Sequence, residues 1–290
     1  MGRRRIDSVF SFFGCLIILR LIMRALFLFL FMGPLCLIQT AMAQKVVEES
    51  KLKVFFEKRG LEGCFVVLNP VMDTLHVYNP ERAKQGFLPA STFKIPMALM
   101  GLDTGAVKDV EEVIPYGGTK EWLKDWERDM NLKEAMKLSN VAIFHQVAKR
   151  VGMVRIKSYL SSFDYGNQQT GDDIGRRFWL EGPLEISALQ QVEFLRRLSD
   201  GKIPLKKETL PAVRELTIYD NILGAAIYAK TGWSGSTGQQ VGWWIGWVEV
   251  EGLNYPFALN AKIPTLEDAK KRIPTALDCL KALGIWNGKE

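Results

Sequence analysis

The pattern of apolar and polar residues separates a long apolar leader from a segment in which helical and strand patterns follow one another. Residues 46–59 carry apolar side chains at helical spacing up to Gly60, which predicts an amphipathic helix. Two short apolar runs, residues 63–68 and 74–78, flank the Asn69-Pro70 turn and predict two strands. After its leader the chain is therefore expected to begin as a helix followed by a hairpin.

Helical spacing dominates the middle of the chain, and strand patterns return near its end. The segments predicted as helices, or as helices joined by turns, are 92–102, 120–129, 132–138, 141–151 and 154–160. Apolar and aromatic runs predict strands at 225–228, 240–250 and 255–260, and a closing helix spans 267–283. No internal repeat interrupts this order.

Early and late strands around a helical middle predict a mixed α+β fold, in which one antiparallel sheet is assembled from both ends of the chain. The sheet is expected to be flanked by helices. We expect residues 44–90 and 216–290 to form the sheet lobe and residues 91–215 to form a mainly helical second lobe. An active site is then expected in the cleft between the lobes.

The leader, residues 1–43, has the features of an export signal. Arg3, Arg4 and Arg5 precede a nearly continuous apolar run from Val9 to Leu37. Ala41-Met42-Ala43 has the small-residue form that signal peptidase cleaves, so the mature protein is expected to begin at Gln44 and to be periplasmic or secreted. Two alternatives stay open, a translation start at Met23 and an uncleaved membrane anchor, against which Arg24 interrupts the apolar run.

Composition narrows the function classes. The leader holds five Arg and one Asp, so the formal net charge falls from +6 for the whole chain to +2 without it. No basic stripe with interleaved aromatic residues remains, which argues against a nucleic-acid partner. The chain has only two histidines, His76 and His145, which disfavours both a Ser-His-Asp triad and a zinc site. Cys64 and Cys279 are interpreted as buried free thiols, with a disulfide between them as the alternative.

Ser91-Thr92-Phe93-Lys94 is the first candidate for chemistry. A lysine one helical turn after a serine lies on the same face, where its amine acts as a base if burial keeps it neutral. An isolated match more often marks a helix cap and a solvated lysine, and two further copies begin at Ser50 and Ser199. Only the Ser91 copy opens a long apolar helix, so context favours this copy.

Lys230-Thr231-Gly232 is the second candidate, since it follows a predicted strand and fits the edge of a cleft. The lysine and threonine can bind a substrate carboxylate, while the glycine lets the substrate approach the strand. Three further motifs, taken one by one, are explained by ordinary structural roles, as a helix cap, a turn and core aromatic residues. They are Ser139-Asn140-Val141, Tyr165-Gly166-Asn167 and Phe178-Trp179-Leu180.

In this order, and after an export signal, the five motifs resemble those of class D (oxacillinase-type) serine β-lactamases. Ser-x-x-Lys and Lys-Thr-Gly mark the superfamily of penicillin-recognising serine enzymes, whereas Tyr-Gly-Asn and the tryptophan indicate the class. The resemblance covers residues 46–286. It implies a β-lactamase/transpeptidase-like fold, hydrolysis of penicillins and oxacillin-type compounds, and resistance to these antibiotics.

The resemblance also implies a role for each motif residue. Ser91 is the nucleophile, and Lys94, carboxylated by CO2, is the general base for acylation and deacylation. The backbone N–H groups of Ser91 and Trp233 form the oxyanion hole. Ser139 relays a proton to the lactam nitrogen with electrostatic support from Lys230.

The remaining roles concern the surroundings of the base and of the substrate. Phe93, Val141 and Trp179 bury the base, and the Trp179 indole donates to the carbamate. Thr231 and Gly232 contact the substrate, and Arg272 binds its carboxylate, with Lys270 and Lys271 as neighbouring alternatives. The residues expected to shape the cleft wall are Tyr165 and Asn167.

Small-molecule β-lactams are the expected partners, and no metal, cofactor, nucleic acid or lasting membrane association is expected. Two rivals remain, a penicillin-binding peptidase and a β-lactam sensor domain, both of which would be acylated without turnover. The apolar Val141 and Trp179 argue against the peptidase. The sensor would need a true anchor and a signalling domain.

Overall fold

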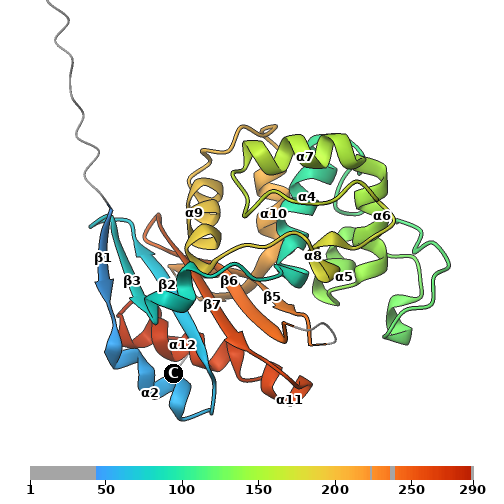
Figure 1. Cartoon of the computed structure of the whole chain (residues 1–290). Coiled ribbons are helices and arrows are strands. Elements are labelled where there is room, and N and C mark those ends of the chain that lie inside the picture. Colours follow the sequence, from blue (N-terminus) through green and yellow to red (C-terminus); the bar gives the residue numbers. More distant parts are fainter. Residues whose placement is uncertain (1–43, 223, 236–238, 289–290) are drawn as a thin grey trace, which may run out of the picture. The chain divides into compact units, whose positions relative to one another are not determined.

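A sheet of seven strands organises the part of the chain that the structure describes (Figure 1). The structure is a computed structural model, and it describes residues 44–222, 224–235 and 239–288. The strand order is β1-β3-β2-β7-β6-β5-β4, and all neighbouring pairs are antiparallel except β1 and β3. The strands are β1 Lys45–Glu48, β2 Gly63–Asn69, β3 Thr74–Tyr78, β4 Ile218–Ile222, β5 Ala225–Trp233, β6 Val241–Val250 and β7 Leu253–Lys262.

The sheet is assembled from both ends of the chain, as the sequence predicts, because the early strand β2 pairs with the late strand β7. The mixed α+β fold is therefore confirmed. Residues 44–290 group as one compact unit, and the division into lobes at residues 91 and 215 stays a prediction. The predicted leader and its cleavage site lie outside the described residues. Within the described ranges, the structure contains no helix with the length and apolar character that crossing a membrane requires.

The helices occupy both faces of the sheet and the region beside it. The early and late ones are η1 Ser50–Leu52, α2 Lys53–Glu57, α3 Pro80–Lys84, η2 Ala90–Phe93, α4 Lys94–Asp103, α11 Leu266–Ala269 and α12 Arg272–Ala282. Those between them are η3 Lys124–Trp126, α5 Leu132–Lys137, α6 Val141–Val151, α7 Met153–Ser162, α8 Phe178–Glu181, α9 Ala188–Ser199 and α10 Thr209–Thr217.

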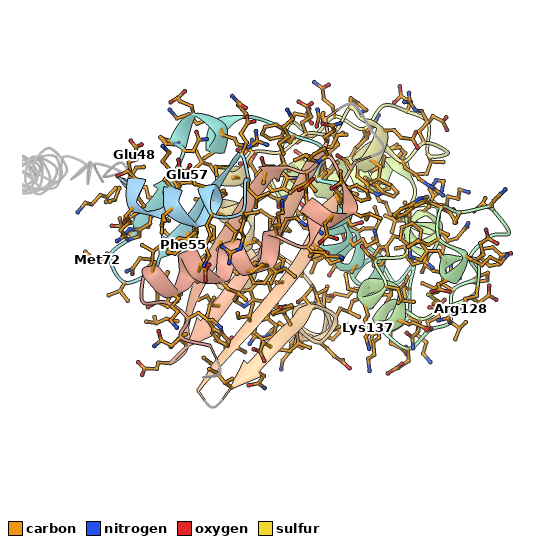
Figure 2. All side chains as sticks on the ribbon, turned by 90° about the horizontal axis from the view of Figure 1, so that it is seen from below. Glu48, Phe55, Glu57, Met72, Arg128 and Lys137 are labelled. Atoms are coloured by element: carbon orange, nitrogen blue, oxygen red, sulfur yellow. The ribbon has the colours of Figure 1, made fainter. Side chains whose placement is uncertain are left out.

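Alternation along the strands creates two apolar cores, one on each face of the sheet. Phe65 and Trp244 lie in the core that α2 and α12 cover, whereas Val66 and Trp243 lie in the core shared with α4, α6 and α9. Figure 2 shows α12 crossing the strands, with Phe55 of α2 on this side of the sheet. The same view shows Arg128 and Lys137 at the far, helical end. Cys64 and Cys279 are buried free thiols in different cores, so the expectation of free thiols is confirmed.

Two predicted helices are wrong in part. Residues 46–59 are not one helix, because Val46 and Val47 pair in parallel with Leu75 and His76 of β3 and the α-helix begins only at Lys53. Within residues 120–129 only η3 is helical. The indole N–H of Trp126 donates to the carbonyl of Leu138 (3.1 Å), and this contact fixes the segment as a loop against the helices instead.

Candidate active site

Ser91 and Lys94 meet at the junction of η2 and α4. The Nζ atom of Lys94 donates to Ser91 Oγ over 2.8 Å, the contact expected for residues one turn apart on a helix. Ser91 retains 9% and Lys94 only 1% of its exposed surface. The lysines of the other two Ser-x-x-Lys copies are exposed, and Lys53 and Lys202 form ion pairs with Glu57 and Asp200. Of the three copies, only this one buries its lysine.

The environment of Lys94 favours a neutral amine. Burial lowers the pKa of Lys94 well below its ordinary value, and the charges of Lys230 and Arg177 lower it further. The Phe144 ring lies 5.5 Å from the Lys94 nitrogen and contributes to the apolar enclosure. A neutral amine has a free lone pair, so Lys94 can act as a base or as a nucleophile toward CO2.

Ser139 and Lys230 form a second hydrogen-bonded pair. Lys230 Nζ donates to Ser139 Oγ over 3.0 Å and lies 3.1 Å from the carbonyl oxygen of Thr231. Burial, followed by the charge of Arg272, lowers the pKa of Lys230 to about 7. Near neutral pH this lysine can therefore exist in both protonation states, as a proton relay requires.

Ser139 is held through the residues on both sides of it, because the Leu138 carbonyl accepts from the Trp126 indole and the Asn140 amide donates to the Trp126 carbonyl. It adopts a left-handed backbone conformation with φ of 56°, which is uncommon for a serine. The next residue, Asn140, caps α6 by accepting from the Ile143 N–H over 3.1 Å. The Asn140 amide also donates to the carbonyl of Trp126 over 3.1 Å, which connects the cap to the loop at the mouth of the site.

The second half of β5 lies beside the Ser91 turn. β4 pairs only with residues 225–228 of β5, so the edge of the strand beyond Tyr228 faces η2. Ser234 donates its backbone N–H to Val241 on β6. Since successive N–H groups of a strand point to opposite edges, the N–H of Trp233 is directed toward the Ser91 side.

Gly232 has a structural reason within the protein itself, besides the predicted approach of the substrate. A Cβ atom at this position would lie 3.0 Å from both the Pro89 carbonyl oxygen and the Thr92 side chain. The absence of a side chain therefore lets β5 approach the Ser91 turn itself, before any substrate is considered.

Arg272 is the first residue of α12 and reaches into the cleft. Its guanidinium donates to the carbonyl oxygens of Gly232 and of Trp243, the latter at 3.3 Å. Burial lowers its pKa to about 10. Lys270 and Lys271 pair instead with Glu267 and Asp268 of α11. Of these three cations, only Arg272 lines the cleft.

Trp179 belongs to an aromatic layer beneath the catalytic residues. Its ring stacks on Phe93 with centroids 5.6 Å apart, and its exposed fraction is 1%. The indole nitrogen of Trp179 is buried and has no hydrogen-bond partner. A buried donor without an acceptor is unfavourable, so this N–H is suited to an acceptor that is added to the site.

The structure does not bring Tyr165 and Asn167 to the cleft wall. Tyr165 is fully buried, and its ring packs edge-on against Phe93 with centroids 5.7 Å apart. The Asn167 side chain donates to the carbonyl of Pro183 (2.9 Å) and accepts from the backbone N–H of Glu185 (3.1 Å). Both residues support the site from behind, since one fills its aromatic layer and the other fixes a loop.

The cleft has a volume of about 610 Å³ and includes residues that the sequence did not single out. Glu121 and Arg177 form an ion pair at its wall, and Trp122 contacts Trp233 with ring centroids 5.9 Å apart. No local pattern indicates these contacts, because the two partners of each lie in distant segments. The lining residues are Ser91, Lys120, Glu121, Trp122, Leu123, Trp126, Leu138, Ser139, Val141, Arg177, Leu180, Thr231, Gly232, Trp233, Gly235, Pro264 and Arg272.

Comparisons with known proteins give matches over most of the chain. Residues 63–281 match the transpeptidase family, described as penicillin binding protein transpeptidase domain. The chain is 38% identical to "Beta-lactamase OXA-10" of Pseudomonas aeruginosa, over 87% of this chain and 96% of that protein. It is 35% identical to "Beta-lactamase OXA-48" of Klebsiella pneumoniae, over 83% of this chain and 91% of that protein.

Solved structures give the same relationship. FUS-1 (OXA-85), a class D β-lactamase from Fusobacterium nucleatum, superposes with a TM-score of 0.78 at 37% identity, covering 82% of this chain and 99% of that chain. The class D β-lactamase YbXI from Nostoc has a TM-score of 0.78 at 34% identity, over 81% of this chain and 99% of that chain.

Proposed function

This chain belongs to the class D serine β-lactamases and hydrolyses β-lactams, and we propose that it does so through an acyl-enzyme on Ser91 with N-carboxylated Lys94 as general base. The resemblance that the motifs indicated is thereby confirmed at the level of family and activity. One observation carries the proposed mechanism, the 2.8 Å contact between Ser91 Oγ and the nitrogen of a fully buried lysine.

The buried amine fits carboxylation. When Lys94 is neutral, its nitrogen forms a bond to the carbon of CO2, one C=O π pair moves to oxygen, and the nitrogen releases a proton to solvent. The low pKa of Lys94 supports the neutral form, and the partnerless indole N–H of Trp179 supplies a donor for the new carboxylate. The new carboxylate supplies an oxygen base beside Ser91. It requires no metal.

Acylation then follows from the positions of the side chains. Ser91 Oγ transfers its proton to carboxylated Lys94 and attacks the lactam carbonyl carbon. The carbonyl oxygen becomes an oxyanion, which the N–H groups of Ser91 and Trp233 stabilise. The C–N bond of the ring breaks, and Ser139 passes its proton to the departing nitrogen while Lys230, which donates to Ser139 over 3.0 Å, replaces that proton. The proton that carboxylated Lys94 took from Ser91 then passes through solvent to Lys230, which leaves the carboxylate unprotonated for the next step.

Deacylation uses the same base in a second step. Carboxylated Lys94 removes a proton from water, which attacks the ester carbonyl and releases Ser91 and the opened product. The substrate is held throughout by its carboxylate. Thr231 and Arg272 both line the cleft and offer a hydroxyl and a buried cation to that group.

Penicillins and oxacillin-type compounds are the proposed substrates, because hydrophobic side chains of such compounds suit the apolar wall formed by Trp122, Trp126 and Leu138. We further propose that residues 1–43 direct export and are removed before Gln44. The mature enzyme would then meet its substrates in the periplasm, where hydrolysis protects the cell from β-lactam antibiotics.

Steady-state hydrolysis of a penicillin and a chromogenic cephalosporin tests the proposal, with and without bicarbonate and beside a Ser91→Ala control. The expected result is multiple turnover that increases with bicarbonate and is absent from the control. A single stoichiometric acylation without turnover would contradict the proposal and would indicate a penicillin-binding peptidase or a β-lactam sensor.

A further inference from the structure

His145 lies on α6, one turn after Val141, and retains only 8% of its exposed surface. Its Nε2 atom lies 2.9 Å from the carbonyl oxygen of Ile174. A carbonyl oxygen only accepts hydrogen bonds, so Nε2 must carry the hydrogen and donate it. The histidine therefore connects α6 to the segment 174–179, which ends at Trp179.

The same ring also contacts the other end of that segment. The imidazole of His145 packs edge-on against the Trp179 ring, with centroids 6.1 Å apart and an interplanar angle of 70°. Trp179 also stacks on Phe93, at 5.6 Å and 22°. Trp179 thus contacts both the histidine and the residue that directly precedes Lys94.

The charges around His145 favour its neutral form. Burial lowers the pKa of His145, and the cations Lys149 of the same helix and Arg177 of the facing segment lower it further. The carbonyl of Ile174 and the carboxylate of Glu121 act in the opposite direction. A neutral imidazole with hydrogen on Nε2 can hold the Ile174 carbonyl without adding a charge next to Arg177.

We propose that His145 is a positioning residue for the lysine base, because its contacts with the Ile174 carbonyl and the Trp179 ring hold the indole N–H of Trp179 where carboxylated Lys94 can accept from it. This inference rests on the proposed carboxylation of Lys94. Without the Ile174 contact, the segment 174–179 gains freedom, and the indole N–H spends less time at the carboxylate. The carbamate then loses CO2 more readily.

Three substitutions separate the hydrogen bond from the bulk of the ring. His145→Gln keeps a donor near the Nε2 position, whereas His145→Leu keeps the volume and removes the donor. His145→Asn keeps an amide that is too short to reach the Ile174 carbonyl, and it serves if the leucine variant does not fold. His76→Leu, which changes the other histidine on the distant strand β3, is the matched control.

The measurement is kcat for a penicillin against bicarbonate concentration, together with the 13C carbamate signal of the same full-chain protein in 13C-bicarbonate. In His145→Leu and His145→Asn, half-maximal kcat should require roughly tenfold more bicarbonate, the effect of one lost buried hydrogen bond. Saturating bicarbonate should restore kcat, and KM should stay unchanged. His145→Gln and His76→Leu should behave as the unmodified enzyme.

The results distinguish the role of His145 from the proposed role of carboxylated Lys94. An unmodified enzyme with neither bicarbonate dependence nor a carbamate signal would overturn the proposed base and this inference with it. If the unmodified enzyme shows both, but the leucine and asparagine variants need no more bicarbonate than it does, only the role of His145 is overturned. Equal impairment of His145→Gln would likewise reject the hydrogen bond as the cause.

Discussion

Single residues of the site are buried in ways that would be unfavourable in an ordinary protein. Lys94 and Lys230 are both removed from water without a carboxylate partner, and each has a lowered pKa for that reason. Trp179 leaves a buried donor unsatisfied. Functional sites keep such unfavourable features because the chemistry needs them.

Lys94→Ala is expected to lower kcat by roughly 10³-fold, the typical contribution of a general base, while Ser91 stays in place. Hydrolysis of a penicillin by stopped-flow absorbance measures this change. Turnover at the level of the unmodified enzyme would exclude Lys94 as the base.

Trp179→Phe removes the indole N–H while retaining an aromatic ring, and it should slow deacylation more than acylation. Added bicarbonate should rescue the loss. Trp247 is the matched control, since its indole nitrogen is also buried without a partner but its ring stacks on Tyr228 of β5 and not on Phe93. Trp247→Phe should show no bicarbonate effect, and the same response from both variants would reject the assigned role.

Lys230→Met tests the cost of burying the second lysine. In the folded protein the pKa of Lys230 is about 7, against an ordinary value of 10.5, so the unfolded chain binds more protons between these values. The stability contribution of this group therefore falls as pH decreases from about 10.5 to 7, and stays low below that. We expect the methionine variant to have a higher Tm at pH 7 and a smaller advantage at pH 10, by calorimetry. An equal Tm difference at both values would contradict the shift.

At the scale of elements, the site depends on how helices begin and how strands end. η2 leads directly into α4, which places Ser91 and Lys94 on one face. Asn140 begins α6 immediately after Ser139, and β5 extends past the end of β4 to meet the Ser91 turn. The site therefore forms where the start of α4, the start of α6 and the end of β5 come together.

Asn140→Ala should reduce both stability and activity. It removes the cap of α6 and the contact with the Trp126 carbonyl, so we expect a loss of about 1–2 kcal/mol in urea unfolding together with lower kcat. Asn131→Ala is the control, because Asn131 caps α5 in the same way, whereas only Asn140 lies between two residues of the cleft lining, Ser139 and Val141. It should cost about 1 kcal/mol at unchanged kcat. Equal effects on kcat would show that Asn140 has no special connection to Ser139.

Much of the element pattern can be predicted from the sequence, and the exceptions have physical reasons. Short apolar and aromatic runs identified β2, β3, β5, β6 and β7, which supply most of the buried residues of the sheet. The strand β1 was missed because its pairing with β3 is a long-range contact that a local helical spacing conceals. The helix α9 was missed despite a readable signal, the capping box formed by Ser187 and Gln190.

The residues of the site likewise divide into those that the sequence predicted and those that it did not. Ser91, Lys94, Ser139 and Lys230 were predicted from motif order, and the structure brings all four together. The Glu121–Arg177 ion pair and the contact of His145 with Ile174 were not predicted, because each joins loops or helices that are distant in the sequence. Such contacts have no local signature.

At the scale of the whole molecule, β2 and β7 join the two ends of the described chain, so the site is expected to form only when the sheet is complete. Phe257 of β7 packs against both Phe65 and Trp244 in the core beneath α12. Phe257→Ala should lower the free energy of unfolding by about 3–5 kcal/mol. Circular dichroism and activity should be lost in one shared urea transition. Activity lost well before the circular dichroism signal would instead indicate a helical lobe that unfolds separately.

Turnover through a Ser91 ester can be followed by mass spectrometry of the enzyme quenched in acid during hydrolysis of a penicillin. Peptide mapping should find the mass of the intact penicillin added to the peptide that contains Ser91. This adduct should disappear once the substrate is exhausted. An adduct on another residue, or an adduct on Ser91 that persists after exhaustion, would contradict the account.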